Sequence, residues 1–132
     1  MEYWKDLHGK KVQAVSINKE KDLVRIDFKA FGKSYVYLRA YGDCCSTSWF
    51  EHIEGLQFLV GGTISDVVER EMQKEFEDSN GDSIQVYGWS IKTDKGQCEI
   101  EMRNSSNGYY GGSVEFGTED TSESPLVKAK DF

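Results

Sequence analysis

The sequence has one proline, three cysteines and no long apolar run. Apart from stretches that contain tyrosine, no uninterrupted apolar segment is longer than Phe58-Leu59-Val60, whereas a membrane-spanning helix needs about 20 apolar residues. We therefore expect neither a transmembrane helix nor a secretory signal. Positive charge is also scarce, with 16 Lys and Arg against 23 Asp and Glu and a net charge of -7. This balance argues against general nucleic-acid binding, which requires cations that displace counterions from phosphates.

The three cysteines are Cys44, Cys45 and Cys98, an odd number that includes an adjacent pair. This is not the even, spaced set of a disulfide-rich secreted domain, so we expect reduced thiols in a cytoplasmic protein. A metal site built from Asp43, His52 and cysteine is an alternative. Zinc sites, however, use spaced cysteines whose thiolates converge, and adjacent cysteines point apart. We predict no metal site and no cofactor.

Alternation of apolar and polar residues is the main structural signal of the chain. Its 132 residues, 38% of them hydrophobic, suffice for one domain with its own core. A period of two predicts β-strands, and it occurs over residues 11–17, 23–29, 34–40, 63–72, 84–92, 97–103 and 113–116. The turn at 93–96, which ends in glycine, indicates a β-hairpin. Residues 73–82 are charged and predict a solvated loop.

Residues 48–59 differ from these segments. Ser48 followed by Glu51 fits a helix capping box, and Trp49, Phe50 and Ile53 follow at helical spacing. This pattern predicts one short helix that buries Trp49 and Phe50. The expected fold class is therefore α+β, an antiparallel sheet of six or seven strands with this helix packed on it. We expect a globular domain over residues 1–117 and an acidic, flexible tail over 118–132.

Charge is distributed unevenly along the chain. Residues 1–40 hold nine Lys and Arg against five Asp and Glu, a net of +4, and residues 41–132 hold seven against eighteen, a net of -11. We expect an electrically polarised molecule. Glu99 and Glu101, on the outer side of the strand over 97–103, are candidate solvated contacts for a basic partner protein.

Two segments could carry chemistry. In the first segment, residues 41–52, a cysteine thiolate at a helix start with His52 as base would suit nucleophilic catalysis. No orienting Asn is evident, however. A structural motif that fills the core is the simpler interpretation, with the residues Asp43, Cys44, Cys45, Ser48, Trp49 and Phe50.

The second segment, 103–112, is rich in Asn, Ser, Gly and Tyr, which is typical both of tight turns and of adaptable recognition loops. Its backbone N–H groups could also hold a phosphate, with Arg103 as counter-ion. The alternative is a plain hairpin loop whose asparagines bond to the backbone. The candidate binding residues are Arg103, Asn104, Asn107, Tyr109 and Tyr110.

These two segments resemble a family of small proteins found in bacteriophage genomes and prophages. The resemblance rests on Gly42-Asp43-Cys44-Cys45-Ser46-x-Ser48-Trp49-Phe50 and on Arg103-Asn104-Ser105-Ser106-Asn107-Gly108-Tyr109-Tyr110-Gly111-Gly112. It covers residues 33–116 and transfers no catalytic or ligand-binding residue. It implies a phage-type accessory protein in the cytoplasm of a bacterial host cell.

Non-enzymatic binding is the function class that we expect. The first hypothesis is an inhibitor of a bacterial host defence nuclease, of the anti-CRISPR kind, whose acidic surface engages a bacterial protein with a basic surface. An immunity protein that neutralises a basic toxin is a related alternative. A different hypothesis is a module that sequesters a nucleotide or other small ligand through the 103–112 loop. An enzyme that uses Cys44 or Cys45 is the least favoured of these hypotheses.

Overall fold

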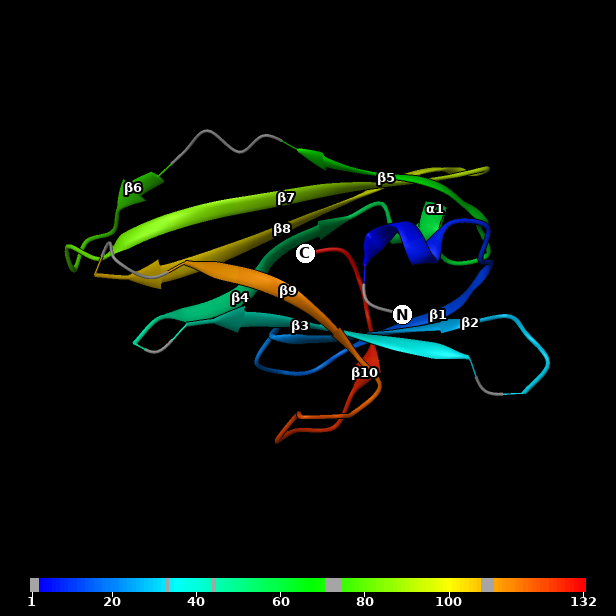
Figure 1. The fold of residues 1–132 in the computed structure, drawn as a ribbon, viewed down its shortest axis with the longest axis horizontal. Coiled ribbons are helices and arrows are strands. Elements are labelled where there is room, and N and C mark those ends of the chain that lie inside the picture. The colour runs from blue at the N-terminus through cyan, green and yellow to red at the C-terminus, as the bar shows by residue number, and fades with distance from the viewer. Residues whose placement is uncertain (1–2, 33, 44, 71–74, 108–110) are drawn as a thin grey trace.

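The computed structural model describes residues 3–32, 34–43, 45–70, 75–107 and 111–132. Within these ranges the chain forms two antiparallel sheets that pack face to face (Figure 1). In the order β10-β1-β2-β3-β9, the first sheet contains β1 (Val12–Ile17), β2 (Leu23–Phe28), β3 (Tyr35–Gly42), β9 (Gly112–Gly117) and β10 (Val127–Lys128). In the order β4-β8-β7-β5, the second contains β4 (Thr47–Glu54), β5 (Ile64–Arg70), β7 (Ser83–Thr93) and β8 (Gly96–Ser106).

Three short elements complete the fold. These are η1 (Trp4–Leu7), a 3-10 helix, α1 (Leu56–Leu59) and β6 (Glu75–Glu77), a strand that pairs with β7. The charged segment 73–82 is therefore not only a loop, because its residues 75–77 add a strand to the second sheet. Neither helix of the described residues has the length and apolar character to cross a membrane.

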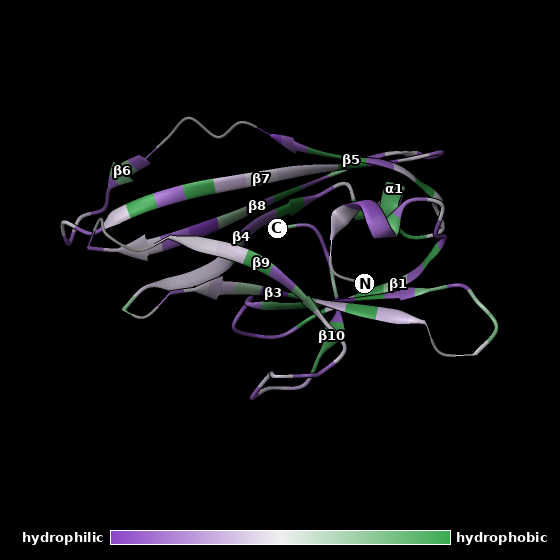
Figure 2. Cartoon of the chain, viewed as in Figure 1, coloured by the Kyte–Doolittle hydropathy of each residue, from purple (hydrophilic) through white to green (hydrophobic). Residues whose placement is uncertain are grey.

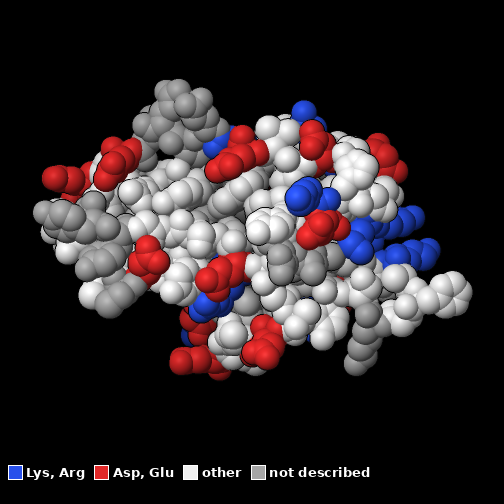
Figure 3. Space-filling view, viewed as in Figure 1, with Lys and Arg blue, Asp and Glu red and all other residues white. Residues whose placement is uncertain are grey.

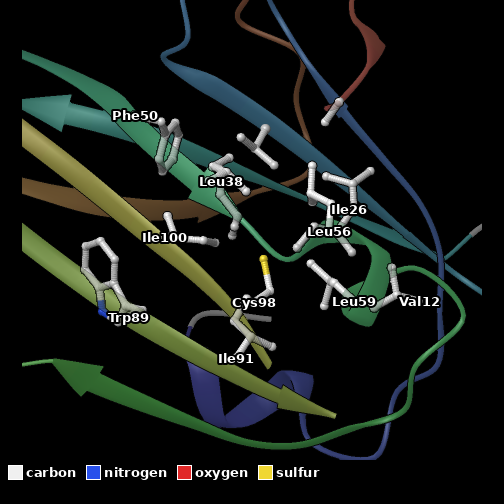
Figure 4. Close-up of a cluster of buried hydrophobic side chains, with 14 of the residues drawn as sticks. Val12, Ile26, Leu38, Phe50, Leu56, Leu59, Trp89, Ile91, Cys98 and Ile100 are labelled. Atoms are coloured by element: carbon white, nitrogen blue, oxygen red, sulfur yellow. The ribbon is translucent and has the colours of Figure 1, made fainter. Parts of the chain in front are cut away.

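The core lies between the two sheets. Ile26 and Leu38 from the first sheet meet Phe50, Ile91 and Ile100 from the second in one buried cluster (Figure 4). Apolar and polar residues alternate along the strands (Figure 2), as a strand with one buried face requires. Burial of each large apolar side chain of this cluster stabilises the folded state by about 1.5–3 kcal/mol. The contacts between the two apolar faces therefore hold the sheets together.

The predicted antiparallel β-sheet architecture is confirmed, but the described residues are mainly β, with little helix, rather than α+β. The described residues form ten strands in two sheets rather than six or seven in one. The helix predicted over 48–59 is wrong, because residues 47–54 form β4 and only 56–59 are helical. The pairing of β4 with β8 shifts register between Phe50 and His52, which inserts one extra residue. Such a bulge places Phe50 and Ile53, three residues apart, on the same buried face and so imitates helical spacing.

The alternation of β4 separates the two aromatic residues that were predicted to be core, because neighbouring residues of a strand point to opposite faces. Phe50 is fully buried between the sheets, as predicted. The prediction for Trp49 is wrong, because Trp49 is only half-buried and pairs with Arg103 across the outer side of the sheet. Its indole Nε1 donates a hydrogen bond to Glu51 Oε2 at 2.7 Å.

The predicted flexible tail over 118–132 is also wrong for its last residues. Strand β10 pairs with β1, and Ala129 is buried beside it. The carboxylate of Asp131 accepts hydrogen bonds from the backbone N–H groups of Gly55 and Leu56, both at 3.0 Å. Gly55 has a φ of 90°, a left-handed conformation that glycine adopts without strain. The strand in this segment is only two residues long, and the acidic composition of the segment did not indicate it.

Candidate functional site

The two sequence motifs pack against each other where β3 leads into β4. Asn104, on β8, is fully buried, and its Nδ2 donates to Ser46 Oγ at 3.1 Å and to Ser48 Oγ at 2.9 Å. Ser48 Oγ in turn donates to the carbonyl of Tyr41 at 3.0 Å. A Cβ at Gly112 would lie 2.6 Å from Ser48 Oγ, so only glycine allows this approach. The prediction of Asn104 as a recognition residue is therefore wrong, because it ties two strands together inside the protein.

The charged candidates on β8 lie on the outer side of the second sheet. Arg103 forms ion pairs with Glu101 at 3.1 Å and with Glu51 at 3.6 Å. Arg70, from β5, forms an ion pair with Glu99 at 2.9 Å. The side chains of Glu99 and Glu101 are only 23% and 19% exposed. The prediction that they are solvated is wrong, because Arg70 reaches Glu99 across β7 and Arg103, on the same strand, reaches Glu101.

Cys45 and His52 of the hypothetical cysteine enzyme are not brought together. Cys45 is exposed before β4, whereas His52 lies about 17 Å beyond Thr47 along that extended strand. His52 Nε2 contacts Glu54 Oε2 at 3.0 Å. Cys98 is buried in the core, and burial raises the pKa of its thiol to about 12. Within the described residues, no group of three or more His, Cys, Asp and Glu could hold a metal ion.

The remaining candidates lie at or beyond the ends of the strands. Asp43 and Asn107 are exposed, in the segments that precede β4 and follow β8. Cys44, Tyr109 and Tyr110 lie outside the described residues. Nucleotide stacking by the two tyrosines of the 103–112 loop therefore stays a prediction.

A pocket of about 600 Å³ opens between β9 of the first sheet and β5 and β7 of the second, with η1 at its edge. This volume lies in the range of about 300–1,000 Å³ typical of small-molecule sites. Of the described residues that line it, half are aromatic, namely Tyr3, Trp4, Tyr87, Trp89 and Phe116. The others are Lys5, Glu69, Gly112, Ser113 and Val114.

The aromatic walls are held in place by one another and by the second motif. The rings of Trp4 and Trp89 stack with centroids 5.4 Å apart and planes at 30°, and Phe116 packs edge-on against Trp4 at 5.1 Å. The hydroxyl of Tyr87 donates to Gln85 Oε1 at 2.9 Å and accepts the backbone N–H of Gly112 at 3.3 Å. The pocket therefore has fixed walls that join η1 to both sheets.

A few polar groups surround this apolar surface. The carboxylate of Glu69 is exposed and forms no hydrogen bond or ion pair within the described residues. The indole N–H of Trp89 likewise has no hydrogen-bond partner there. The ammonium of Lys5 lies 5.4 Å from the centroid of the Tyr3 ring. An apolar surface with a few polar groups at its edge is suited to holding and orienting a small ligand.

The pocket was not predicted from the sequence. Tyr87 and Trp89 lie two residues apart in the strand predicted over 84–92, and in β7 both line the pocket. No role was predicted for Trp4, which lies in a polar N-terminal segment, or for Phe116. One feature of the sequence could have indicated the pocket, namely the aromatic side of the strand over 84–92. Such a side needs a covering element from elsewhere in the chain.

Comparison with known proteins places the chain in a family with a viral relative. An uncharacterised protein, L278, of Acanthamoeba polyphaga mimivirus is 36% identical over 109 residues, which cover 79% of this chain and 84% of the viral protein. No solved structure matches the chain. The bacteriophage origin and the location in a bacterial cell stay predictions. Residues 5–116 match the family model described as Domain of unknown function (DUF7448), and this chain therefore belongs to that family.

Proposed function

We propose that this protein is a non-enzymatic binding protein that holds a small, largely apolar ligand in the pocket between β5, β7 and β9. The observation that carries the proposal is the aromatic lining of a solvent-open pocket of about 600 Å³. Aromatic rings bury a large area at little conformational cost. Large apolar surfaces left open on a small protein are characteristic of binding sites.

The fixed positions of the walls support this role. Trp89 is only 7% exposed and belongs to the same cluster as the core residues (Figure 4). Tyr87 is held at its hydroxyl by Gln85 and by the backbone of Gly112. A site that is ordered before the ligand arrives loses less entropy when it binds. The pocket therefore needs little rearrangement to bind a ligand.

Filling the pocket should abolish ligand binding without unfolding the protein. The probe is N-phenyl-1-naphthylamine, a neutral aromatic fluorophore. Val114→Trp places a large side chain inside the pocket, because Val114 lines it, and should weaken saturable probe binding at least about tenfold. Val68→Trp is the matched control, because Val68 is exposed on β5 and does not line the pocket.

The control variant should bind the probe as the wild-type protein does. Circular dichroism during thermal unfolding shows whether both variants retain a cooperative fold. Equal probe affinities in the wild-type protein and a folded Val114→Trp variant would contradict the proposed site.

Inhibition of a bacterial host defence nuclease is the second candidate function, and one observation favours it. Glu75, Glu77, Asp78 and Asp82 lie together at the end of the molecule that carries β6, and none of the four forms an ion pair within the described residues. Figure 3 shows acidic side chains at this end and a group of basic ones at the opposite end. Such polarity accelerates encounter with a basic partner.

Reversing charge at this acidic end tests the second candidate. Nucleases captured from a bacterial lysate by the immobilised protein should be lost with Glu75→Lys/Glu77→Lys and at high salt, because the attraction would be electrostatic. The control is Glu119→Lys/Glu123→Lys, which makes the same charge change on the exposed segment after β9. Equal nuclease capture by both double variants, with no effect of salt, would exclude the acidic end as the docking surface.

A further inference from the structure

We propose that the ligand of the pocket between β5, β7 and β9 carries an organic cation, namely a quaternary or methylated ammonium group. This group binds against the aromatic walls, with Glu69 as its counter-ion. This inference rests on the proposed small-ligand function and specifies the chemical class of the ligand.

The position of Glu69 is the first argument. Glu69 on β5 pairs directly with Trp89 on β7, so the two side chains lie on the same side of the sheet, with Cβ atoms about 5 Å apart. The adjacent residue, Arg70, points to the opposite side and pairs with Glu99. Glu69 therefore lines the pocket and has no ion-pair partner among the described residues, so a bound cation would supply a compensating charge.

The aromatic walls are the second argument. The face of an aromatic ring carries partial negative charge and attracts ammonium groups, and clusters of aromatic rings recognise quaternary ammonium ligands in this way. Among the described residues, four aromatic side chains besides Tyr3 line this pocket, including the largest and most favourable ring type, tryptophan. At the edge of the pocket the ammonium of Lys5 already lies over the Tyr3 ring, 5.4 Å from its centroid.

An anionic ligand fits the same surroundings less well. Among the described residues that line the pocket, Lys5 is the one basic side chain, and it is exposed. Arg39, on the neighbouring first sheet, is engaged with Glu115 at 2.6 Å on the outer side. A phosphate in the pocket would meet one solvated ammonium and the carboxylate of Glu69. The net charge of -7 further favours cations near the surface.

A pair of isosteric ligands isolates the charge. Choline and 3,3-dimethylbutan-1-ol have the same shape, but the alcohol has a neutral carbon in place of the ammonium nitrogen. Binding is followed through the indole N–H resonances of Trp4 and Trp89 in ¹H–¹⁵N spectra, with Trp49 as the internal reference. We expect choline to bind at least about fivefold more tightly than the alcohol.

Glu69→Gln should weaken choline binding by about threefold to tenfold and leave binding of the alcohol unchanged, because it removes charge and retains shape. Glu119→Gln is the control, since it makes the same change on the exposed segment after β9. Equal binding of choline and the alcohol would overturn the inference and leave the proposed function standing. Choline binding that is insensitive to Glu69→Gln, or tighter binding of AMP than of choline, would also overturn the inference. If choline, the alcohol, AMP and the neutral naphthylamine all failed to bind, the proposed function itself would fail.

Discussion

Phe50→Ala should lower the free energy of unfolding by about 3–5 kcal/mol, whereas Trp49→Ala should lower it by only about 1 kcal/mol. The two residues are adjacent in β4, and the larger one has the smaller expected effect. Phe50 is fully buried between the sheets, so its removal leaves a cavity that rigid neighbours cannot fill. Trp49 is half-buried on the outer side and contributes a hydrogen bond to Glu51.

Urea denaturation of the two variants and of the wild-type protein measures both changes. Phe50→Leu serves as a control for shape, because it retains most of the buried apolar volume and should cost less than the alanine substitution. If Trp49→Ala proved as damaging as Phe50→Ala, β4 could not present these side chains to opposite sides.

Asn104→Ala should destabilise the protein by about 2–3 kcal/mol, a large effect for the loss of one polar side chain. Asn104 donates hydrogen bonds to Ser46 and Ser48, and these hydroxyls already donate to the carbonyls of Asp43 and Tyr41. Both serines can therefore only accept from Asn104, which fixes the orientation of its amide. Removing the amide leaves buried acceptors without a donor and opens a cavity between the motifs.

A double-mutant cycle with Ser48→Ala separates the hydrogen bond from the cavity. We expect a coupling energy of about 1 kcal/mol between Asn104 and Ser48, since they are in direct contact. Additive effects of the two substitutions, measured by urea denaturation, would contradict the hydrogen bond as the link between the motifs. Ligand binding in the pocket should persist in the folded variants, because neither residue lines it.

The pattern of alternating residues was sufficient to predict most of the strands. A strand with one buried side needs an apolar residue at every second position, whatever its neighbours are. The segments that became β2, β3, β7 and β8 satisfy this rule. The turn between β7 and β8 was predicted for the same reason, since its residues are local to the hairpin.

Features that depend on partners distant in sequence were decided only by the tertiary structure. The bulge in β4 arises from its register with β8, and β10 is a strand only because β1 pairs with it. Glu99 differs from the solvated residue that was predicted because Arg70, from β5, reaches it across β7.

The pocket follows the same principle. Trp4 and Trp89 are separated by most of the chain, yet they stack because η1 is packed beside β5 at the edge of the two sheets. The sequence by itself determined which side of each strand is apolar, because that property belongs to the strand alone. Only the tertiary structure determined which apolar sides are covered and which one stays open, because covering an aromatic side requires a second element at the right place.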